Sequence, residues 1–337
     1  MKVFEIRDDW GMDHLQLGER PEPDPAPGQV KLKMKAASLN SRDLIVPLRG
    51  YGRATGELPL IPLSDGVGEV VAVGDGVNQW AIGDRVCPAF FQSWDGGGAS
   101  AERLAQALGG PLDGVMAEYM CVDQNGVVAA PKHLSDAEVA TLACAGVTAW
   151  SALVTNGGIK AGQRVLIQGS GGVALFALAF AKMHGAHVTM ISSSDEKIEK
   201  LKAMGADAAV NYKTEPDWGK PAKVLSEQDG FDHIVELGGE ATLPQSLRCI
   251  RPGGSIYLIG VLSGLDLSAS LGPVVTRQIR LQGITVGSRE SMAAMAQAIG
   301  QHGMRPVIDQ SFDFDALKDG MAALKSGGHM GKICLAF

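Results

Sequence analysis

The sequence predicts an α/β protein that contains a doubly wound parallel sheet and a separate β-rich unit. From about Ser135, short apolar runs of strand length alternate with helical patterns, and this βαβ order is typical of a parallel sheet covered on both faces. The residues before it show strand patterns separated by long loops. Because 337 residues exceed the usual size of one compact domain, we expect two domains.

The β-rich unit shows alternating apolar and polar residues from Val30 to Leu39, after a Pro-rich turn, which is the period of a half-buried strand. Val67 to Val73 and Asp84 to Val86 are bounded by Gly-Asp turns and predict two more strands. The glycine-rich stretch from Phe91 to Gly114 predicts a loop around at most one short helix, from Ala99 to Leu108.

Strands and helices alternate in the second part of the chain. Apolar runs predict strands at Arg164 to Gln168, His187 to Ser192, Ala208 to Val210, His233 to Leu237, Ser255 to Ile259 and Leu281 to Val286. Helical patterns cover Gly172 to His184, Asp195 to Met204 and Thr242 to Ile250. After Ser288 we expect a helix from Ser291 to His302, a second helix from Phe314 to Ser326, and a terminal strand from Lys332 to Ala336.

Composition limits the possible functions. The formal net charge of −7 argues against a general binder of nucleic acid or of an anionic membrane. The five cysteines have neither zinc-knuckle nor CxxC spacing, so we expect reduced core thiols. Charges interrupt the N-terminal segment where a signal peptide needs an apolar run, and no apolar stretch reaches the length of a membrane span. We therefore expect a soluble cytoplasmic protein with a small-molecule substrate.

A glycine-rich turn carries the first functional signal. Gly169, Gly171 and Ala174 occupy the three positions of G-x-G-x-x-G/A, directly after a predicted strand and at the start of a predicted helix. Gly169 permits the tight turn, and Gly171 lets the backbone approach a pyrophosphate at the positive end of the helix. With Gly172 and Val173 this turn predicts a dinucleotide-binding site. The alternative is a strand-to-helix turn without a ligand.

The end of the following strand indicates which dinucleotide is bound. Sites for NAD place an acidic residue there, but this strand ends in Ser192, Ser193 and Ser194. Serine hydroxyls and a nearby cation, Lys197, suit a 2′-phosphate, so we expect NADPH rather than NADH. The alternatives are that Ser194 is a helix N-cap and that Lys197 is a solvated surface lysine.

Several longer motifs follow one another along almost the whole chain. They include SRDL (Ser41 to Leu44), DGVGEVVAVGDGV (Asp65 to Val77), CAGVTAW (Cys144 to Trp150), GSGGV (Gly169 to Val173) and RPGG (Arg251 to Gly254). In this order they resemble the medium-chain dehydrogenase/reductase superfamily. The resemblance implies a GroES-like, partly open β-barrel catalytic domain, formed by residues 1–129 and 289–337, with a Rossmann dinucleotide-binding domain inserted at residues 130–288. It also implies a homodimer joined through the strand at Leu281 to Gly287.

The resemblance also separates zinc-dependent from zinc-free members. Zinc members place a cysteine where this chain has Asn40, and a histidine followed by glutamate where it has Ser64 and Asp65. Only Cys144 keeps a metal-binding side chain, and one thiolate cannot make a three-ligand catalytic site. The cysteine-rich lobe of many relatives corresponds to Phe91 to Gly114, which has no cysteine. We therefore expect no metal, a buried core role for Cys144, and a place in the zinc-free, quinone-oxidoreductase-like branch.

Further cofactor positions come from the resemblance to that branch. Ser193, Lys197 and Tyr212 match the positions around the adenosine 2′-phosphate. Thr148 matches a threonine near the nicotinamide ribose, and Gly260 with Val261 matches a strand-end segment beside the nicotinamide.

Two residues are candidates for the catalytic role. Asn40 stands where the metal ligand would be, and its amide N–H is a suitable donor to the nicotinamide ribose or to a substrate oxygen. Tyr51 lies in the loop after the SRDL motif, and its phenol is a candidate proton or hydrogen-bond donor to the substrate. The alternative for Tyr51 is an aromatic ring packed in a glycine-rich loop.

Three functions remain open from the sequence. The first is NADPH-dependent hydride transfer to a quinone or an α,β-unsaturated carbonyl without catalytic zinc, because the hydride adduct of such an acceptor is delocalised without a Lewis acid. The second is an alcohol dehydrogenase or ketone reductase of the same superfamily. The third is a non-catalytic NADPH-binding redox sensor or structural protein.

Overall fold

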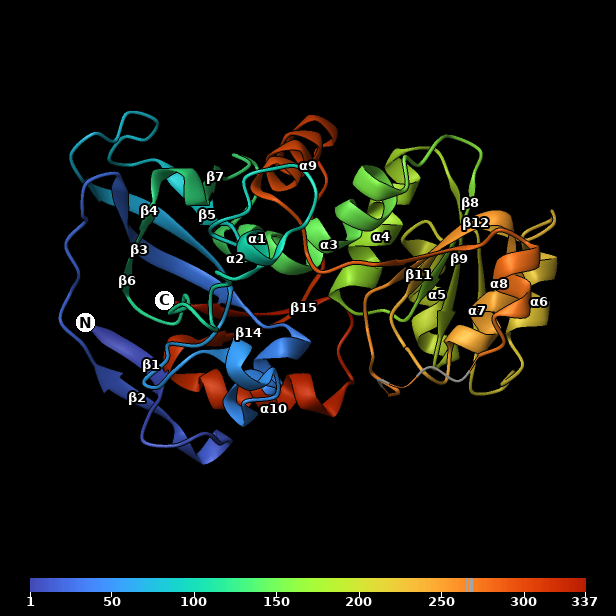
Figure 1. Cartoon of the computed structure of the whole chain (residues 1–337), viewed down its shortest axis with the longest axis horizontal. Helices are drawn as coiled ribbons and strands as arrows, with labels where there is room; N and C mark the ends of the chain where they lie inside the picture. The colour runs from blue at the N-terminus through green and yellow to red at the C-terminus, as the bar shows by residue number, and fades with distance from the viewer. Residues whose placement is uncertain (265, 267–268) are drawn as a thin grey trace. The chain divides into compact units, whose positions relative to one another are not determined.

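The computed structural model describes residues 1–264, 266 and 269–337, and the chain forms two compact units. The first unit contains residues 1–147 and 286–337, and therefore both chain ends, and the second contains residues 148–285 (Figure 1). This division places residues 130–147 in the first unit, whereas we expected the inserted domain to begin at residue 130. The physical reason is that helix α2 (Asp136–Ala140) packs on strands β3 (Gln29–Ser38) and β4 (Asp65–Val73) of the first unit.

The main sheet of the first unit joins strands from both ends of the chain. The order among the described residues is β14-β15-β3-β4-β5-β7, with β6 also paired to β3, and only β14 and β15 run parallel. The remaining strands are β5 (Arg85–Pro88), β6 (Tyr119–Asp123), β7 (Val127–Ala129), β14 (Ile308–Asp313) and β15 (Lys332–Ala336), and a separate ribbon comprises β1 (Lys2–Ile6) and β2 (Leu15–Glu19). The predicted strand over Val30 to Leu39 is confirmed as β3.

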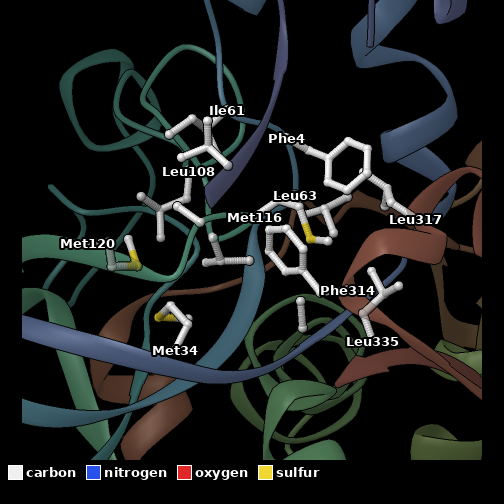
Figure 2. Close-up of a cluster of buried hydrophobic side chains, with 14 of the residues drawn as sticks. Phe4, Met34, Ile61, Leu63, Leu108, Met116, Met120, Phe314, Leu317 and Leu335 are labelled. Atoms are coloured by element: carbon white, nitrogen blue, oxygen red, sulfur yellow. The ribbon is translucent and has the colours of Figure 1, made fainter. Parts of the chain in front are cut away.

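The core of the first unit explains why the two ends of the chain come together. Figure 2 shows Phe4, Phe314 and Leu335 in one cluster of buried apolar side chains, although they are far apart in the sequence. The rings of Phe4 and Phe314 lie 5.6 Å apart between centroids. Burial of such side chains contributes about 1.5–3 kcal/mol each, so the C-terminal segment is held to the N-terminal strands mainly by apolar packing.

The helices of the first unit are short, apart from the two near the C-terminus. They are α1 (Ala101–Leu104), α2, α9 (Arg289–His302) and α10 (Leu317–Ser326), with 3₁₀ turns η1 (Met12–His14), η2 (Ser41–Leu44), η3 (Val46–Leu48), η4 (Gly52–Thr55), η5 (Gln124–Gly126) and η8 (Phe314–Ala316), and the π-helical turn η6 (Leu142–Gly146). The predicted helix over Ala99 to Leu108 is present only at α1, and the prediction is wrong for the residues on either side. Its last residues are extended, because Gln106 and Leu108 hydrogen-bond with the backbone at Gln92 and Phe90.

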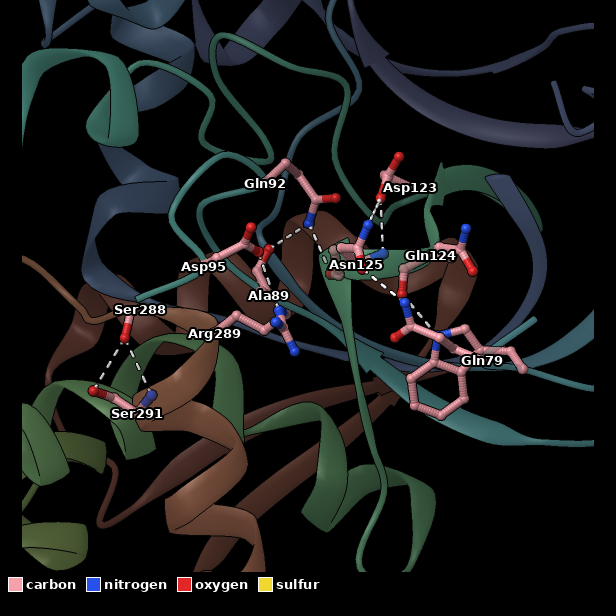
Figure 3. A network of polar contacts seen from close by, with 12 residues as sticks. Gln79, Ala89, Gln92, Asp95, Asp123, Gln124, Asn125, Ser288, Arg289 and Ser291 are labelled. Atoms are coloured by element: carbon pink, nitrogen blue, oxygen red, sulfur yellow. Dashed lines mark hydrogen bonds and ion pairs between the residues drawn. The ribbon is translucent and has the colours of Figure 1, made fainter. Parts of the chain in front are cut away.

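Hydrogen bonds secure the long loop that begins at Phe91. Gln92 Nε2 donates to the carbonyls of Ala89 (2.7 Å) and Gly126 (3.1 Å), and the Arg289 guanidinium pairs with Asp95 at 3.2 Å (Figure 3). Arg289 begins helix α9, whose N-cap is Ser288. The loop is thus tied both to the β6–β7 turn and to the start of α9 by polar side chains.

The second unit contains the predicted doubly wound sheet, which is confirmed as fully parallel. Its order within the described part of the chain is β10-β9-β8-β11-β12-β13. The strands are β8 (Arg164–Gln168), β9 (His187–Ser192), β10 (Ala208–Asn211), β11 (Phe231–Glu236), β12 (Ile250–Leu258) and β13 (Arg280–Gly283). Its helices and turns are α3 (Val147–Trp150, which crosses the unit boundary), η7 (Ser151–Asn156), α4 (Gly172–Met183), α5 (Asp195–Ala203), α6 (Gly219–Leu225), α7 (Leu243–Cys249) and α8 (Gly272–Thr276).

The strand order has a consequence for ligand binding. The connection reverses direction between β8 and β11, and open α/β sheets bind ligands outside the carboxyl ends of the strands at such a point. Strand β12 begins at Ile250, earlier than the predicted Ser255, because Ile250 pairs with Phe231 across an irregular register. No helix among the described residues is long and apolar enough to cross a membrane.

A buried histidine lies inside the parallel sheet. His233 on β11 is 5% exposed; its Nε2 lies 3.0 Å from Gln163 Oε1 and its Nδ1 lies 2.9 Å from the Tyr257 hydroxyl. Gln163 Oε1 also accepts from the Lys160 N–H, so Nε2 is the protonated nitrogen and Tyr257 donates to Nδ1. Burial lowers the pKa of His233 to about 4.

This histidine predicts a loss of stability in mild acid. The unfolded state takes up a proton near the ordinary pKa of 6.5, whereas the native state does not until about 4, so stability falls as the pH drops below about 6.5. Between about pH 7.5 and about pH 5, we expect the free energy of unfolding to fall by about 2 kcal/mol less in His233→Gln than in the native protein. Urea unfolding at both pH values measures the free energy of unfolding, and His302→Gln, at an exposed histidine, is the control. If His233→Gln lost as much stability as the native protein between the two pH values, His233 would not be the group responsible.

Candidate functional site

The glycine-rich turn after β8 leaves room for a ligand. Gly169 has φ +80°, a conformation that favours glycine, and Gly171 is the N-cap of α4. A Cβ added to either glycine would meet no heavy atom of the described structure within 4 Å. Helix α4 begins at Gly172 without a side-chain cap, so its first N–H groups are available to an anion. The turn therefore fits a dinucleotide pyrophosphate.

A buried polar network joins the ends of β8 and β11. The Glu236 carboxylate is fully buried and accepts hydrogen bonds from Gln168 Nε2 (2.6 Å) and from the N–H groups of Gly238 and Gly239 (both 3.1 Å). The hydroxyls of Thr242 and Ser246 also donate to it. Gln168 directly precedes Gly169, so this network holds the cofactor turn and the loop after β11 in one arrangement.

Gly260 has a packing role in the structure. Its N–H donates to the Glu236 carbonyl at 3.2 Å, and a Cβ on Gly260 would lie 2.0 Å from the Leu237 carbonyl oxygen. Only glycine therefore fits this close approach. The next residue, Val261, is 51% exposed at the same end of the sheet. Thr148 lies at the start of the second unit and is 3% exposed.

The ends of β9 and β10 adjoin, as the 2′-phosphate hypothesis requires. The Tyr212 N–H donates to the Ser192 carbonyl at 3.0 Å, and the Tyr212 side chain is 41% exposed. Ser193 follows Ser192 and Lys197 lies in the first turn of α5. Ser194 Oγ accepts from the Lys197 N–H at 3.2 Å, so Ser194 is the helix N-cap that we considered as its alternative.

In the first unit, Asn40 contacts a buried lysine that the sequence analysis missed. Lys332 is 4% exposed; its Nζ donates to Asn40 Oδ1 at 2.6 Å and to the Leu39 carbonyl. The Asn40 N–H donates to Asp43 Oδ2 at 2.7 Å. The only signal in the sequence was the GK pair, Gly331 and Lys332, at the start of the last strand, and this pair does not reveal the distant partner.

Two buried carboxylates accompany this lysine. Asp65 is fully buried and accepts from Ser64 Oγ (2.8 Å) and from the Cys144 N–H (3.2 Å). Burial raises the pKa of Asp65, and the positive charge of Lys332 opposes that shift. Burial likewise raises the pKa of Asp43 to about 6. The positive charge of Lys332 therefore acts on both buried carboxyls and opposes the rise in their pKa values.

These residues do not fit a catalytic zinc ion. Asn40 Oδ1 faces an ammonium group, Ser64 Oγ is bonded to a carboxylate, and burial raises the pKa of the Cys144 thiol far above its ordinary range. No group of three or more His, Cys, Asp or Glu side chains in the described structure could hold a metal ion. The Cys144 residue keeps some exposed surface, although its thiol is strongly desolvated, and all five cysteines are free.

Tyr51 belongs to the same neighbourhood. It is 46% exposed, which fits a side chain available to a ligand better than a packed ring. Burial of its hydroxyl raises the pKa of Tyr51, while the Arg42 guanidinium beside it opposes the shift. Arg42 is held by the carbonyls of Leu108 (2.9 Å) and Gly110 (3.2 Å) and by the ring of Phe90, 4.6 Å away.

Two protein-family models match separate parts of the chain. The model of the alcohol dehydrogenase GroES-like domain matches residues 26–132, and that of the zinc-binding dehydrogenase family matches residues 172–301. The predicted combination of a GroES-like domain with a Rossmann-type parallel sheet is confirmed.

Individual proteins show similarity over almost the full length. A zinc-type alcohol dehydrogenase-like protein of Schizosaccharomyces pombe is 40% identical over 332 residues, 96% of each chain. A solved NAD-dependent alcohol dehydrogenase is 30% identical with a TM-score of 0.90, covering 100% of both chains. A 2-methylene-furan-3-one reductase of Solanum lycopersicum is 30% identical over 341 residues, 99% of this chain and 79% of its own.

The open space at Gly171 predicts a variant that folds but binds cofactor poorly. Gly171→Ala adds a Cβ into empty space, so we expect stability to change by no more than about 1 kcal/mol. The same Cβ occupies the path of a pyrophosphate, so we expect the Kd for the dinucleotide to rise at least about tenfold. Calorimetric titration measures the Kd. Gly300→Ala in α9, which also meets nothing within 4 Å, is the control and leaves the Kd unchanged. Unaltered binding to Gly171→Ala would contradict the site.

Proposed function

The chain belongs to the medium-chain dehydrogenase/reductase superfamily of oxidoreductases, and we propose that it transfers a hydride from NADPH to a quinone or an α,β-unsaturated carbonyl without catalytic zinc. One observation carries this proposal. Lys332 Nζ lies 2.6 Å from Asn40 Oδ1, at the position where zinc members hold a metal ligand. A divalent cation beside a buried ammonium group is strongly repelled, so the chemistry is assigned to an acceptor that needs no Lewis acid.

The chain's own residues have two tasks in this reaction. When bound, a reduced nicotinamide would supply the hydride, with its electron pair, to the β-carbon of the acceptor. The charge then develops on the acceptor oxygen, where the Asn40 side-chain N–H is the donor that stabilises it. The Tyr51 phenol, half exposed beside Arg42, donates a hydrogen bond to the same oxygen or a proton to the enolate.

The preference for NADPH rests on the ends of β9 and β10. No acidic side chain follows β9 until Asp195, and its carboxylate accepts a hydrogen bond from Asn211 Nδ2 at 2.8 Å. The proposed site for the 2′-phosphate comprises Ser193, Lys197 and Tyr212. The Ser192 carbonyl accepts a hydrogen bond from the Tyr212 N–H and so keeps the ends of β9 and β10 together.

A second candidate function has support from the relatives. Two of the three proteins compared carry the name alcohol dehydrogenase or alcohol dehydrogenase-like, which favours reversible alcohol and ketone interconversion. One equivalent of zinc per chain, with activity removed by a chelator, would support that function instead. The third reading, a non-catalytic NADPH-binding protein, requires binding of NADPH without turnover.

The proposed assembly is a homodimer. Strand β13 (Arg280–Gly283) lies at one edge of the parallel sheet, next to β12. An edge strand presents unpaired backbone groups that a second copy can pair, and the superfamily resemblance assigns the dimer contact to this strand.

A turnover comparison tests the proposed reaction. With NADPH, we expect kcat/KM for cyclohexenone or benzoquinone to exceed that for cyclohexanone at least about a hundredfold, because the saturated ketone lacks a delocalised adduct. Metal analysis of the same preparation, purified without chelator, should find substoichiometric zinc. Equal rates for the saturated and unsaturated ketones, or activity that requires zinc, would contradict the proposal.

Lys197 provides the test of cofactor preference. Loss of a charge-assisted hydrogen bond costs about 1.5–3 kcal/mol, so we expect Lys197→Ala to raise the KM for NADPH about tenfold or more. The KM for NADH, which has no 2′-phosphate, should change less than about twofold. Lys202→Ala is the control, because Lys202 lies on the same helix and pairs with Glu199. Equal effects on both cofactors would exclude Lys197 from the phosphate site.

A further inference from the structure

We infer that Lys332 is a positioning residue for the proposed reduction: it orients and polarises the Asn40 amide so that Nδ2 faces the reacting oxygen as a donor. This inference rests on the proposed function of Asn40. It adds a residue from the C-terminal strand to a site otherwise formed by the N-terminal part of the first unit.

Lys332 fixes the orientation of the Asn40 amide. The oxygen and nitrogen of an asparagine side chain are assigned from their hydrogen-bond partners. An ammonium group only donates, and Lys332 Nζ lies 2.6 Å from the Asn40 side chain. The atom facing Lys332 must therefore be Oδ1, and the two N–H groups of Nδ2 point elsewhere.

The Asn40 amide nitrogen retains an unused donor. Asn40 is 8% exposed, and its Nδ2 is buried. Hydrogen bonding from the Asn40 side chain lowers the pKa of the Asp65 carboxyl, so one N–H group of Nδ2 is directed toward Asp65. The other N–H group has no hydrogen-bond partner within the described residues. A buried donor left unpaired costs about 1–3 kcal/mol, which a ligand oxygen would relieve.

The positive charge of Lys332 acts on the Asn40 amide. An acceptor bonded to a cation is polarised, and this strengthens the donor at the other end of the same amide. The ammonium group is held in place because it also donates to the Leu39 carbonyl, and Lys332 is only 4% exposed. A fixed donor aimed at a developing oxyanion is the arrangement that stabilises a transition state more than a bound substrate.

A set of matched variants tests the inference through kcat. Lys332→Met removes both donor and charge, so we expect kcat for cyclohexenone to fall about 10- to 100-fold while the KM for NADPH changes less than about threefold. Lys332→Gln keeps a hydrogen-bond donor without the charge, so its kcat should lie between those of Lys332→Met and the native protein. In the Asn40→Ala background, Lys332→Met should change kcat less than about threefold. Lys31→Met, at another buried lysine of the first unit, is the control and leaves kcat unchanged.

A spectroscopic readout makes the inference independent of turnover. The chain has five asparagines, so side-chain amide signals of ¹⁵N-asparagine-labelled protein can be assigned, that of Asn40 by its loss in Asn40→Ala. We expect Lys332→Gln to shift the Asn40 amide resonance and leave the other four in place, whereas Lys31→Met shifts none of them. The same readout applies where Lys332→Met does not fold.

The outcomes separate the inference from the function on which it rests. An unmoved Asn40 resonance, or an equal loss of kcat in the native and Asn40→Ala backgrounds, would overturn the positioning role. A parallel rise in the KM for NADPH would assign Lys332 to general structure and also overturn it. If the native protein reduces neither cyclohexenone nor benzoquinone, the proposed function fails, while the resonance still decides whether Lys332 orients Asn40.

Discussion

The buried ammonium group of Lys332 is the constraint on which the first unit depends. A buried charge costs several kcal/mol unless it is compensated. Here the compensation comes from two direct acceptors at the end of β3, Leu39 and Asn40, and from the nearby carboxylates of Asp43 and Asp65. The antiparallel pairing of β15 with β3 brings Lys332 to Leu39 and Asn40. The hydrogen bonds of the ammonium group therefore depend on this strand pairing.

The second unit also contains a buried acidic side chain, and neutral hydrogen-bond donors surround it. The Glu236 carboxylate is fully buried, and it accepts hydrogen bonds from an amide, two hydroxyls and two backbone N–H groups. These donors hold the loops on both sides of the point where the strand order reverses. For the proposed cofactor site at the uncapped start of α4, a turn held in this way would need little reorganisation on binding an anion. Each unit thus contains its own buried polar network, one around Glu236 and one around Lys332.

Much of the fold followed from local pattern. Strands β8 and β9 and the start of α4 were predicted at their observed bounds, since buried parallel strands read as short apolar runs and Gly169 and Gly171 mark the turn between them. The helix expected over Ala99 to Leu108 failed because residues 106–108 pair with the backbone near Phe91. Tertiary hydrogen bonds there outweighed helix propensity, which is a weak preference of less than about 1 kcal/mol per residue.

The sequence by itself determined which side chains were available: a glycine-rich turn between a strand and a helix, a strand that ends in serines, and Asn40 and Ser64 at positions where the resemblance to zinc members implies cysteine and histidine. Only the tertiary structure decided which of these groups meet. Asn40 and Lys332 are 292 positions apart, and a hydrogen bond over such a separation leaves no periodic trace in the sequence. Their contact arises from the pairing of β3 with β15, which depends on the packing of the whole first unit.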